Sequence, residues 1–168
     1  MDKWLVRSRS TVGSSNIHFQ FTPKYRRKVF ESEKIMATCK RVMQEIVEEL
    51  GLVWCALEFG PEHVHLFIGN CMHYSVPELA QRLKGASSRR IRQECWEELV
   101  GILQSSSFWS DGYFYEYIGR FTNDSMKYYI ERQQGKNWVG EDYDYYEYKN
   151  SCATNEQDHK PLTLADLF

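Results

Sequence analysis

The sequence of 168 residues predicts an α+β fold. We expect a ferredoxin-like, split β-α-β antiparallel sheet with two helices on one face and an extra C-terminal helix. Three observations predict this fold: short segments in which apolar and polar residues alternate, longer segments with helical periodicity, and the order in which they follow one another. The predicted order is strand, helix, strand, strand, helix, strand, helix, at residues 17–21, 33–50, 52–59, 63–68, 75–99, 113–118 and 123–134.

The first strand and the first helix have recognisable ends. Ile17 to Phe21 alternates apolar and polar residues, and Pro23 ends this strand. Gly51 is well placed to end the helix at 33–50. That helix is predicted from apolar residues that recur at helical spacing. They are Ile35, Cys39, Val42, Met43, Ile46 and Leu50.

The middle of the chain predicts a hairpin and a second helix. The tight connection Gly60-Pro61-Glu62 joins the strands at 52–59 and 63–68. Ser75-Val76-Pro77-Glu78 has the form of a capping box, so it should begin the second helix. We expect Gly85 to break or bend that helix.

The chain is long enough for one ordinary domain with tails. Residues 1–15 are polar and are predicted to form a loosely held N-terminal arm. A single domain is predicted over residues 16–138. Residues 139–168 carry seven acidic and two basic side chains, and we interpret them as an acidic, tyrosine-rich appendage.

Composition argues against several classes of protein. No stretch approaches the roughly 18 to 20 apolar residues of a membrane span, and the N-terminus lacks the apolar segment of a secretory signal. The five cysteines are widely spaced, without a Cys-x-x-Cys pair, which argues against a disulfide framework and a thiolate zinc site. We therefore expect a cytoplasmic protein without a membrane partner.

The net charge of −2 hides an asymmetry along the chain. Residues 1–92 hold fifteen basic and nine acidic side chains, whereas residues 93–168 hold six basic and fourteen acidic ones. A local basic patch attracts a phosphate backbone whatever the net charge is. The alternative is a solvated helix face and a basic turn. Two clusters carry the charge: Lys24-Tyr25-Arg26-Arg27-Lys28, and Lys84 with Arg89, Arg90 and Arg92.

Two histidines leave one face of the predicted strand at 63–68. His63 and His65 are two residues apart, so both side chains lie on the same face, while Val64, Leu66 and Ile68 should be buried under the helices. Two imidazoles so placed can hold one divalent metal ion if a third ligand comes from elsewhere. A chance pair of exposed histidines is the simpler interpretation of this short motif.

The last predicted helix offers a third ligand and a nucleophile. Tyr129 and Gln133 are four residues apart and therefore share one helical face. An ion held by two imidazoles and one amide keeps its full charge and can polarise a phosphate oxygen, which Tyr129 could then attack. The alternative is that Tyr129 is a core residue and Gln133 is exposed to solvent.

Five segments resemble, in the same order, the motifs of the single-tyrosine HUH transposases of small bacterial and archaeal insertion sequences. Pro61 to Ile68 resembles their histidine–hydrophobic–histidine (HUH) strand. Lys127 to Gln133 resembles their catalytic helix, whose pattern is Tyr-Ile-x-x-Gln. The other three segments are Lys24-Tyr25-Arg26-Arg27, Leu83-Lys84-Gly85-x-Ser87-Ser88, and Trp109 to Gly119. The resemblance spans residues 16 to 135.

The resemblance implies a ferredoxin-like domain that works as a homodimer on single-stranded DNA with hairpin ends. It implies a divalent Mg²⁺ or Mn²⁺ ion on His63, His65 and Gln133. Tyr129 would attack the scissile phosphate to form a 5′-phosphotyrosine link, and strand transfer would reverse that step. In the family, the tyrosine helix can complete the partner's active site.

Further roles are predicted for basic and aromatic side chains. Tyr128 is the competing nucleophile, but its partner four residues on is Arg132, which is no metal ligand, so Tyr129 is preferred. Tyr25, Trp109 and the tyrosines of the strand at 113–118 either stack on unpaired bases or pack in the core. The predicted phosphate contacts are Lys24, Arg26, Arg27, Lys84, Arg89 and Arg90.

Two other functions compete with transposition. One is an HUH nickase of the same chemistry, either domesticated or used in replication or mobilisation. The other is a non-catalytic module that binds single-stranded nucleic acid on a ferredoxin-like sheet. The second would leave the positions of His63, His65, Tyr129 and Gln133 as coincidences.

Overall fold

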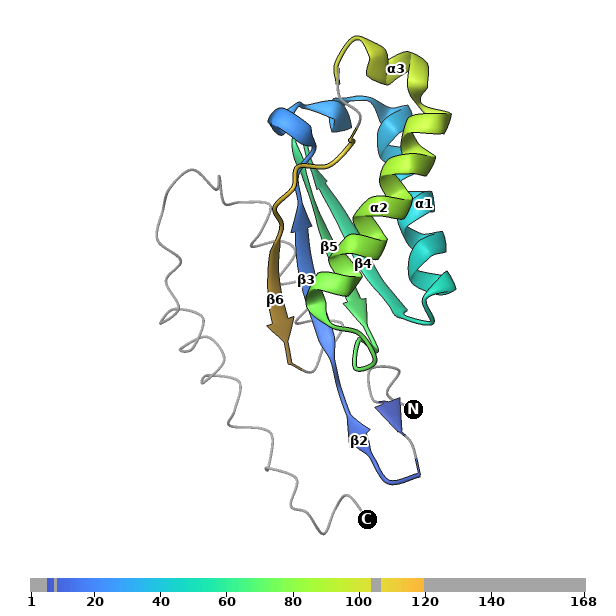
Figure 1. Cartoon of the computed structure of the whole chain (residues 1–168), viewed down its shortest axis with the longest axis vertical. Helices are drawn as coiled ribbons and strands as arrows, with labels where there is room; N and C mark the ends of the chain where they lie inside the picture. The colour runs from blue at the N-terminus through green and yellow to red at the C-terminus, as the bar shows by residue number, and fades with distance from the viewer. Residues whose placement is uncertain (1–5, 8, 104–106, 120–168) are drawn as a thin grey trace, which may run out of the picture. The chain divides into compact units, whose positions relative to one another are not determined.

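The computed structural model describes residues 6–7, 9–103 and 107–119 (Figure 1). The chain divides into two units, residues 1–130 and 131–168, and all described residues belong to the first. The predicted helix at 123–134 and the predicted appendage at 139–168 therefore lie outside the described residues.

A four-stranded antiparallel sheet forms the centre of the described part. Its strands are β3 (Asn16–Phe21), β4 (Val53–Gly60), β5 (His63–Gly69) and β6 (Phe114–Ile118), in the order β4-β5-β3-β6. Because β5 is antiparallel to both β3 and β4, β3 runs parallel to β4 with β5 between them. The α+β fold and the split β-α-β strand order agree with the prediction from sequence.

Two long helices cover one face of this sheet (Figure 1). They are α1 (Glu33–Glu49) and α2 (Val76–Glu94), and a short helix, α3 (Trp96–Val100), follows α2. The buried side chains of α1 and α2 form one core with residues of β3 and β5, among them Phe19 and Leu66. α1 buries five of the six predicted apolar residues, and the sixth, Leu50, follows the helix and is partly buried. The buried residues of α2 are Val76, Leu79, Ala80, Leu83, Ser87 and Ile91. Two short 3₁₀ helices, η1 (Lys24–Arg26) and η2 (Val29–Glu31), connect β3 to α1.

The helix ends follow local chemistry. The Ser75 hydroxyl accepts a hydrogen bond from the backbone N–H of Glu78, as the capping box predicts. Ser32 caps α1 in the same way. Gly51 follows α1 with a φ of +69°, a conformation that favours glycine. The expected break at Gly85 does not occur, and α2 continues through this position as one helix. Residues on both sides of Gly85, such as Leu83 and Ile91, are packed in the core and hold the helix in place.

Residues 6–7 and 9–15 of the predicted N-terminal arm belong to the described part of the chain. Strands β1 (Val6–Arg7) and β2 (Val12–Gly13) form a short antiparallel pair. The backbone N–H of Cys71 then donates to the Ser15 carbonyl at 2.9 Å, which ties the start of β3 to the end of β5. Within the described ranges, no helix is long and apolar enough to cross a membrane.

Candidate active site

His63 and His65 lie on the face of β5 that is turned away from the helices. Val64, Leu66 and Ile68 are fully buried in the core on the other face, as the alternation predicts. The two imidazole rings are neighbours, with centroids 4.9 Å apart. His63 is partly exposed, whereas His65 is only 4% exposed.

Burial keeps both histidines neutral. Burial, together with smaller effects of the neighbouring His18 and His63, lowers the pKa of His65 to about 3. It also lowers the pKa of His63, where nearby Arg26 acts in the same direction and Glu62 opposes it. A neutral imidazole is the form that binds a metal ion. The site therefore offers two imidazoles that are ready to bind without first losing a proton.

Gly60 makes room for the His63 ring. These two residues face each other at the end of the β4–β5 hairpin. A Cβ atom at position 60 would lie 2.6 Å from Nε2 and 2.8 Å from Nδ1 of His63, which is too close for any real contact. A glycine at position 60 is therefore needed for the His63 ring to keep this position.

His18 on β3 is a third histidine of this face, and the sequence analysis did not select it. Its side chain is fully buried, and its Nε2 lies 2.9 Å from Nδ1 of His65, within hydrogen-bond distance. The ring stacks on Phe67 with centroids 4.5 Å apart. A Glu116 carboxylate oxygen of β6 lies 4.0 Å from its Nδ1. Burial lowers the pKa of His18, and Glu116 opposes that shift.

The donor set on this face fits a divalent metal ion in part. His65 Nε2 is buried and has no hydrogen-bond partner among the described residues, so a ligand there would satisfy it. Within the described ranges, no three His, Cys, Asp or Glu side chains are grouped so that they could hold a metal ion. The two imidazoles therefore need a donor of another kind or from another part of the chain. The predicted ligand Gln133 and the predicted nucleophile Tyr129, with its competitor Tyr128, lie outside the described residues.

Most of the predicted phosphate contacts already have partners within the domain. Arg90 forms ion pairs with Glu45 and Glu49 of α1 instead of facing solvent alone. The Lys84 ammonium donates to the carbonyls of Asp111 and Gly112, at 2.8 and 3.0 Å. Two more cations are paired as well: Lys24 with Asp111, and Arg26 with Glu62.

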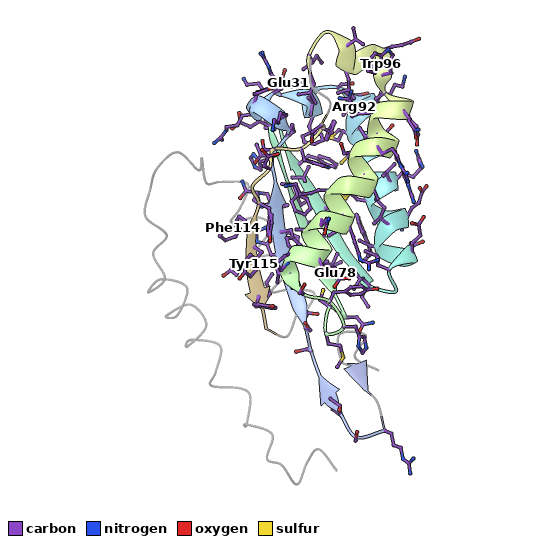
Figure 2. All side chains as sticks on the ribbon, viewed as in Figure 1. Glu31, Glu78, Arg92, Trp96, Phe114 and Tyr115 are labelled. Carbon is purple, nitrogen blue, oxygen red and sulfur yellow. The ribbon has the colours of Figure 1, made fainter. Side chains whose placement is uncertain are left out.

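Arg27 and Arg89 are the two predicted contacts that remain available. Both are exposed, and no hydrogen bond or ion pair joins either side chain to another residue of the described part. Arg89 lines an open groove of about 1040 Å³ between α2 and the segment 107–113. Arg92 and Trp96, both labelled in Figure 2, also line this groove, and the Arg92 guanidinium lies 5.8 Å from the Trp96 ring centre.

The aromatic residues predicted either to stack on bases or to pack in the core differ in their exposure to solvent. Trp109 is a core residue, 1% exposed, whose indole N–H donates to the Ser87 hydroxyl at 2.8 Å. Tyr25 is 66% exposed at the tip of η1, with a φ of +60°. The edge strand β6 presents the exposed ring of Tyr115, labelled in Figure 2. Tyr117 of the same strand is exposed as well. Stacking on bases is thus open to Tyr25 and to the β6 tyrosines, whereas Trp109 is part of the core.

Comparison with known proteins agrees with this description. A curated relative, the ISDra2 transposase TnpA of Deinococcus radiodurans, is 28% identical over 132 residues, which cover 79% of this chain and 93% of the relative. A crystal structure from Deinococcus radiodurans R1, described as that of a transposase, matches with a TM-score of 0.62 and 26% identity, over 76% of this chain and 97% of that one.

A structure of a REP-associated tyrosine transposase bound to a REP hairpin matches at 14% identity and a TM-score of 0.49, over 80% of this chain and 75% of that one. This last match is too distant to bear on function. The model of the IS200-like transposase family matches residues 11–133, which include every segment that suggested this family from sequence. The chain belongs to the IS200-like transposases, the family of single-tyrosine HUH enzymes that its motifs resemble.

Proposed function

We propose that this chain is a metal-dependent transposase that nicks and rejoins single-stranded DNA at insertion-sequence ends through a 5′-phosphotyrosine intermediate. The observation that carries the proposal is the His63–His65 pair, in which the Nε2 atom of His65 is buried and has no partner in the described part of the chain. A structural histidine buried in a core normally satisfies both of its ring nitrogens. This one keeps a nitrogen for a ligand.

In this proposal, His63, His65 and Gln133 hold a divalent Mg²⁺ or Mn²⁺ ion. The ion would supply Lewis-acid polarisation of a phosphate oxygen, and its ligands would leave its charge undiminished because all three are neutral. The low pKa of His65 supports this role, because the imidazole does not compete for a proton near neutral pH.

Tyr129 is the proposed nucleophile. Its hydroxyl oxygen forms a bond to the scissile phosphorus, and the bond from phosphorus to the 3′ oxygen breaks. The phenolic proton is lost to solvent or a base, and the departing 3′ oxygen takes up a proton to become a hydroxyl. One phosphodiester replaces another, so the reverse attack by a 3′-hydroxyl rejoins DNA without an external energy source.

The proposed DNA partner is single-stranded and carries hairpin ends. Arg27 and Arg89 are the best placed phosphate contacts, because neither must leave an ion pair with a described residue. Lys24, Arg26, Lys84 and Arg90 would have to exchange a protein partner for a phosphate. We further propose that the chain acts as a homodimer, with the tyrosine helix able to complete the partner's site.

A denaturing gel tests the chemistry. Labelled single-stranded DNA with the element's end hairpin is incubated with the protein, with and without Mg²⁺ or Mn²⁺. A shifted, protease-sensitive band that requires the metal supports the proposal, and Tyr129→Phe should abolish it while hairpin binding is kept. Tyr128→Phe is the matched control and should retain the band. An adduct that persists in Tyr129→Phe would place the nucleophile elsewhere.

A further inference from the structure

We infer that His18 and Glu116 are positioning residues that fix the tautomer of His65, leaving the lone pair of its Nε2 atom free for the metal ion. The inference rests on the proposed metal site, and it concerns residues to which no role has been assigned above. It starts from the hydrogen bond of 2.9 Å between His18 Nε2 and His65 Nδ1.

A hydrogen bond between two neutral imidazoles has two possible directions. If His18 donates from Nε2, then Nδ1 of His65 is the acceptor and the only proton of His65 lies on Nε2, where it blocks a metal ion. If His65 donates from Nδ1, its Nε2 carries a lone pair instead. The two directions therefore decide whether His65 can be a ligand.

Glu116 selects the second direction. Its carboxylate oxygen lies 4.0 Å from Nδ1 of His18, so its negative charge favours a proton on that nitrogen. A neutral His18 with its proton on Nδ1 has a lone pair on Nε2 and must accept the hydrogen bond from His65. The charge of Glu116 thus determines, through the tautomer of His18, which nitrogen of His65 carries the proton.

The burial of the His65 ring leads to the same tautomer. Nε2 of His65 is buried, and no residue that the structure describes forms a hydrogen bond with it. A proton there would be a buried donor without an acceptor, which costs about 1–3 kcal/mol. A lone pair at that position is instead satisfied when a cation binds.

The strands hold His18 in place for this role. Within the sheet, His18 faces Phe67 of β5 on one side and Glu116 of β6 on the other. Its ring is nearly parallel to that of Phe67, with an angle of 5° between the planes. Because the ring is stacked and fully buried, it cannot turn away from His65 without opening the sheet face.

The first test measures the tautomer in the full-length, metal-free protein. Long-range ¹H–¹⁵N NMR spectra of ¹⁵N-histidine-labelled protein distinguish a protonated ring nitrogen from an unprotonated one. We expect wild-type His65 to be protonated at Nδ1 and unprotonated at Nε2. His18→Phe keeps an aromatic ring on Phe67 but removes the acceptor, so His65 should lose its preference for the Nδ1-protonated form and show both tautomers. Wild-type His65 found with its proton on Nε2 would overturn the inference.

The second test measures the affinity for Mn²⁺ alone, by calorimetry, without DNA. Loss of the positioning residue should weaken Mn²⁺ binding by about 10- to 100-fold in His18→Phe, with a smaller loss in Glu116→Gln. Ser87→Ala is the control for general destabilisation, because Ser87 is a buried polar residue of the core far from this face. Its Mn²⁺ affinity should equal that of the wild type.

Unchanged Mn²⁺ affinity in both His18→Phe and Glu116→Gln would also overturn the inference. Glu116→Gln covers the case in which His18→Phe fails to fold. The failure of the proposed function has a different signature: wild-type protein that forms no covalent DNA adduct, whatever the tautomer of His65 is.

Discussion

Replacing Gly60 by alanine should displace His63 and weaken metal binding without unfolding the domain. The new Cβ atom would stand 2.6 Å from Nε2 of His63. The Cε1 atom of the ring would be closer still, so the ring must move by at least about 1 Å to restore an ordinary contact near 3.4 Å. Metal–ligand distances tolerate only about 0.2 Å of error. We therefore expect His63 to be lost as a ligand and Mn²⁺ affinity to fall by at least about tenfold.

The stability of this variant should hardly change. Gly60 is not in the left-handed region, so alanine is not strained there, and its lower freedom in the unfolded chain contributes about 0.4–1 kcal/mol of stability. The half-exposed His63 ring can move toward solvent. Calorimetry with Mn²⁺ and urea unfolding measure the two effects. Gly101→Ala, where the new Cβ meets nothing within 4 Å, is the control. Wild-type Mn²⁺ affinity in Gly60→Ala would refute the assignment of His63 as a ligand.

Three further predictions concern other parts of the domain. Gly85→Ala adds a Cβ with nothing within 4 Å inside α2, so urea unfolding should show a gain of about 0.5–1 kcal/mol; a loss would mean that the helix needs the glycine. Tyr25→Ala should weaken single-stranded DNA binding by about 1–3 kcal/mol in fluorescence anisotropy while the unfolding midpoint stays constant, and equal affinity would exclude stacking by this ring. The unfolded chain binds a proton at His65 below about pH 6.5 and the folded chain only near pH 3. Through His65, acidification between these values should destabilise the metal-free protein by at most about 1.4 kcal/mol per pH unit, in addition to the losses from His18 and His63, whose pKa values burial also lowers. His65→Asn should reduce this slope in urea titrations.

Most of the sheet could be predicted from the sequence because its strands alternate clearly. His63 to Ile68 places its apolar residues in the core and its histidines on the opposite face, as the period of two requires. The ends of α1 and the start of α2 were also predicted, because Gly51 and Ser75 are strong local signals. The β1–β2 pair was not, because two-residue strands are too short to show a period.

The neighbours of the site could not be predicted, because they depend on the pairing of distant strands. His18 is 47 residues from His65, and only the register between β3 and β5 brings their rings together. The alternation of Ile17 to Phe21 does place His18 on the polar face of its strand. That signal becomes informative only once β3 and β5 are known to be adjacent, with the same faces turned to the helices.

Counting charges along the sequence gave an incomplete account of DNA binding. The basic excess of residues 1–92 is real, but Arg26 and Arg90 are bound to carboxylates of the same domain. Such exposed pairs contribute little stability, so a phosphate can replace the carboxylate at small cost. Arg26 is of special interest because its partner, Glu62, immediately precedes His63. If a phosphate takes Arg26 from Glu62, DNA binding changes the charge beside the metal ligand, and phosphate recognition and metal binding are then coupled through this ion pair.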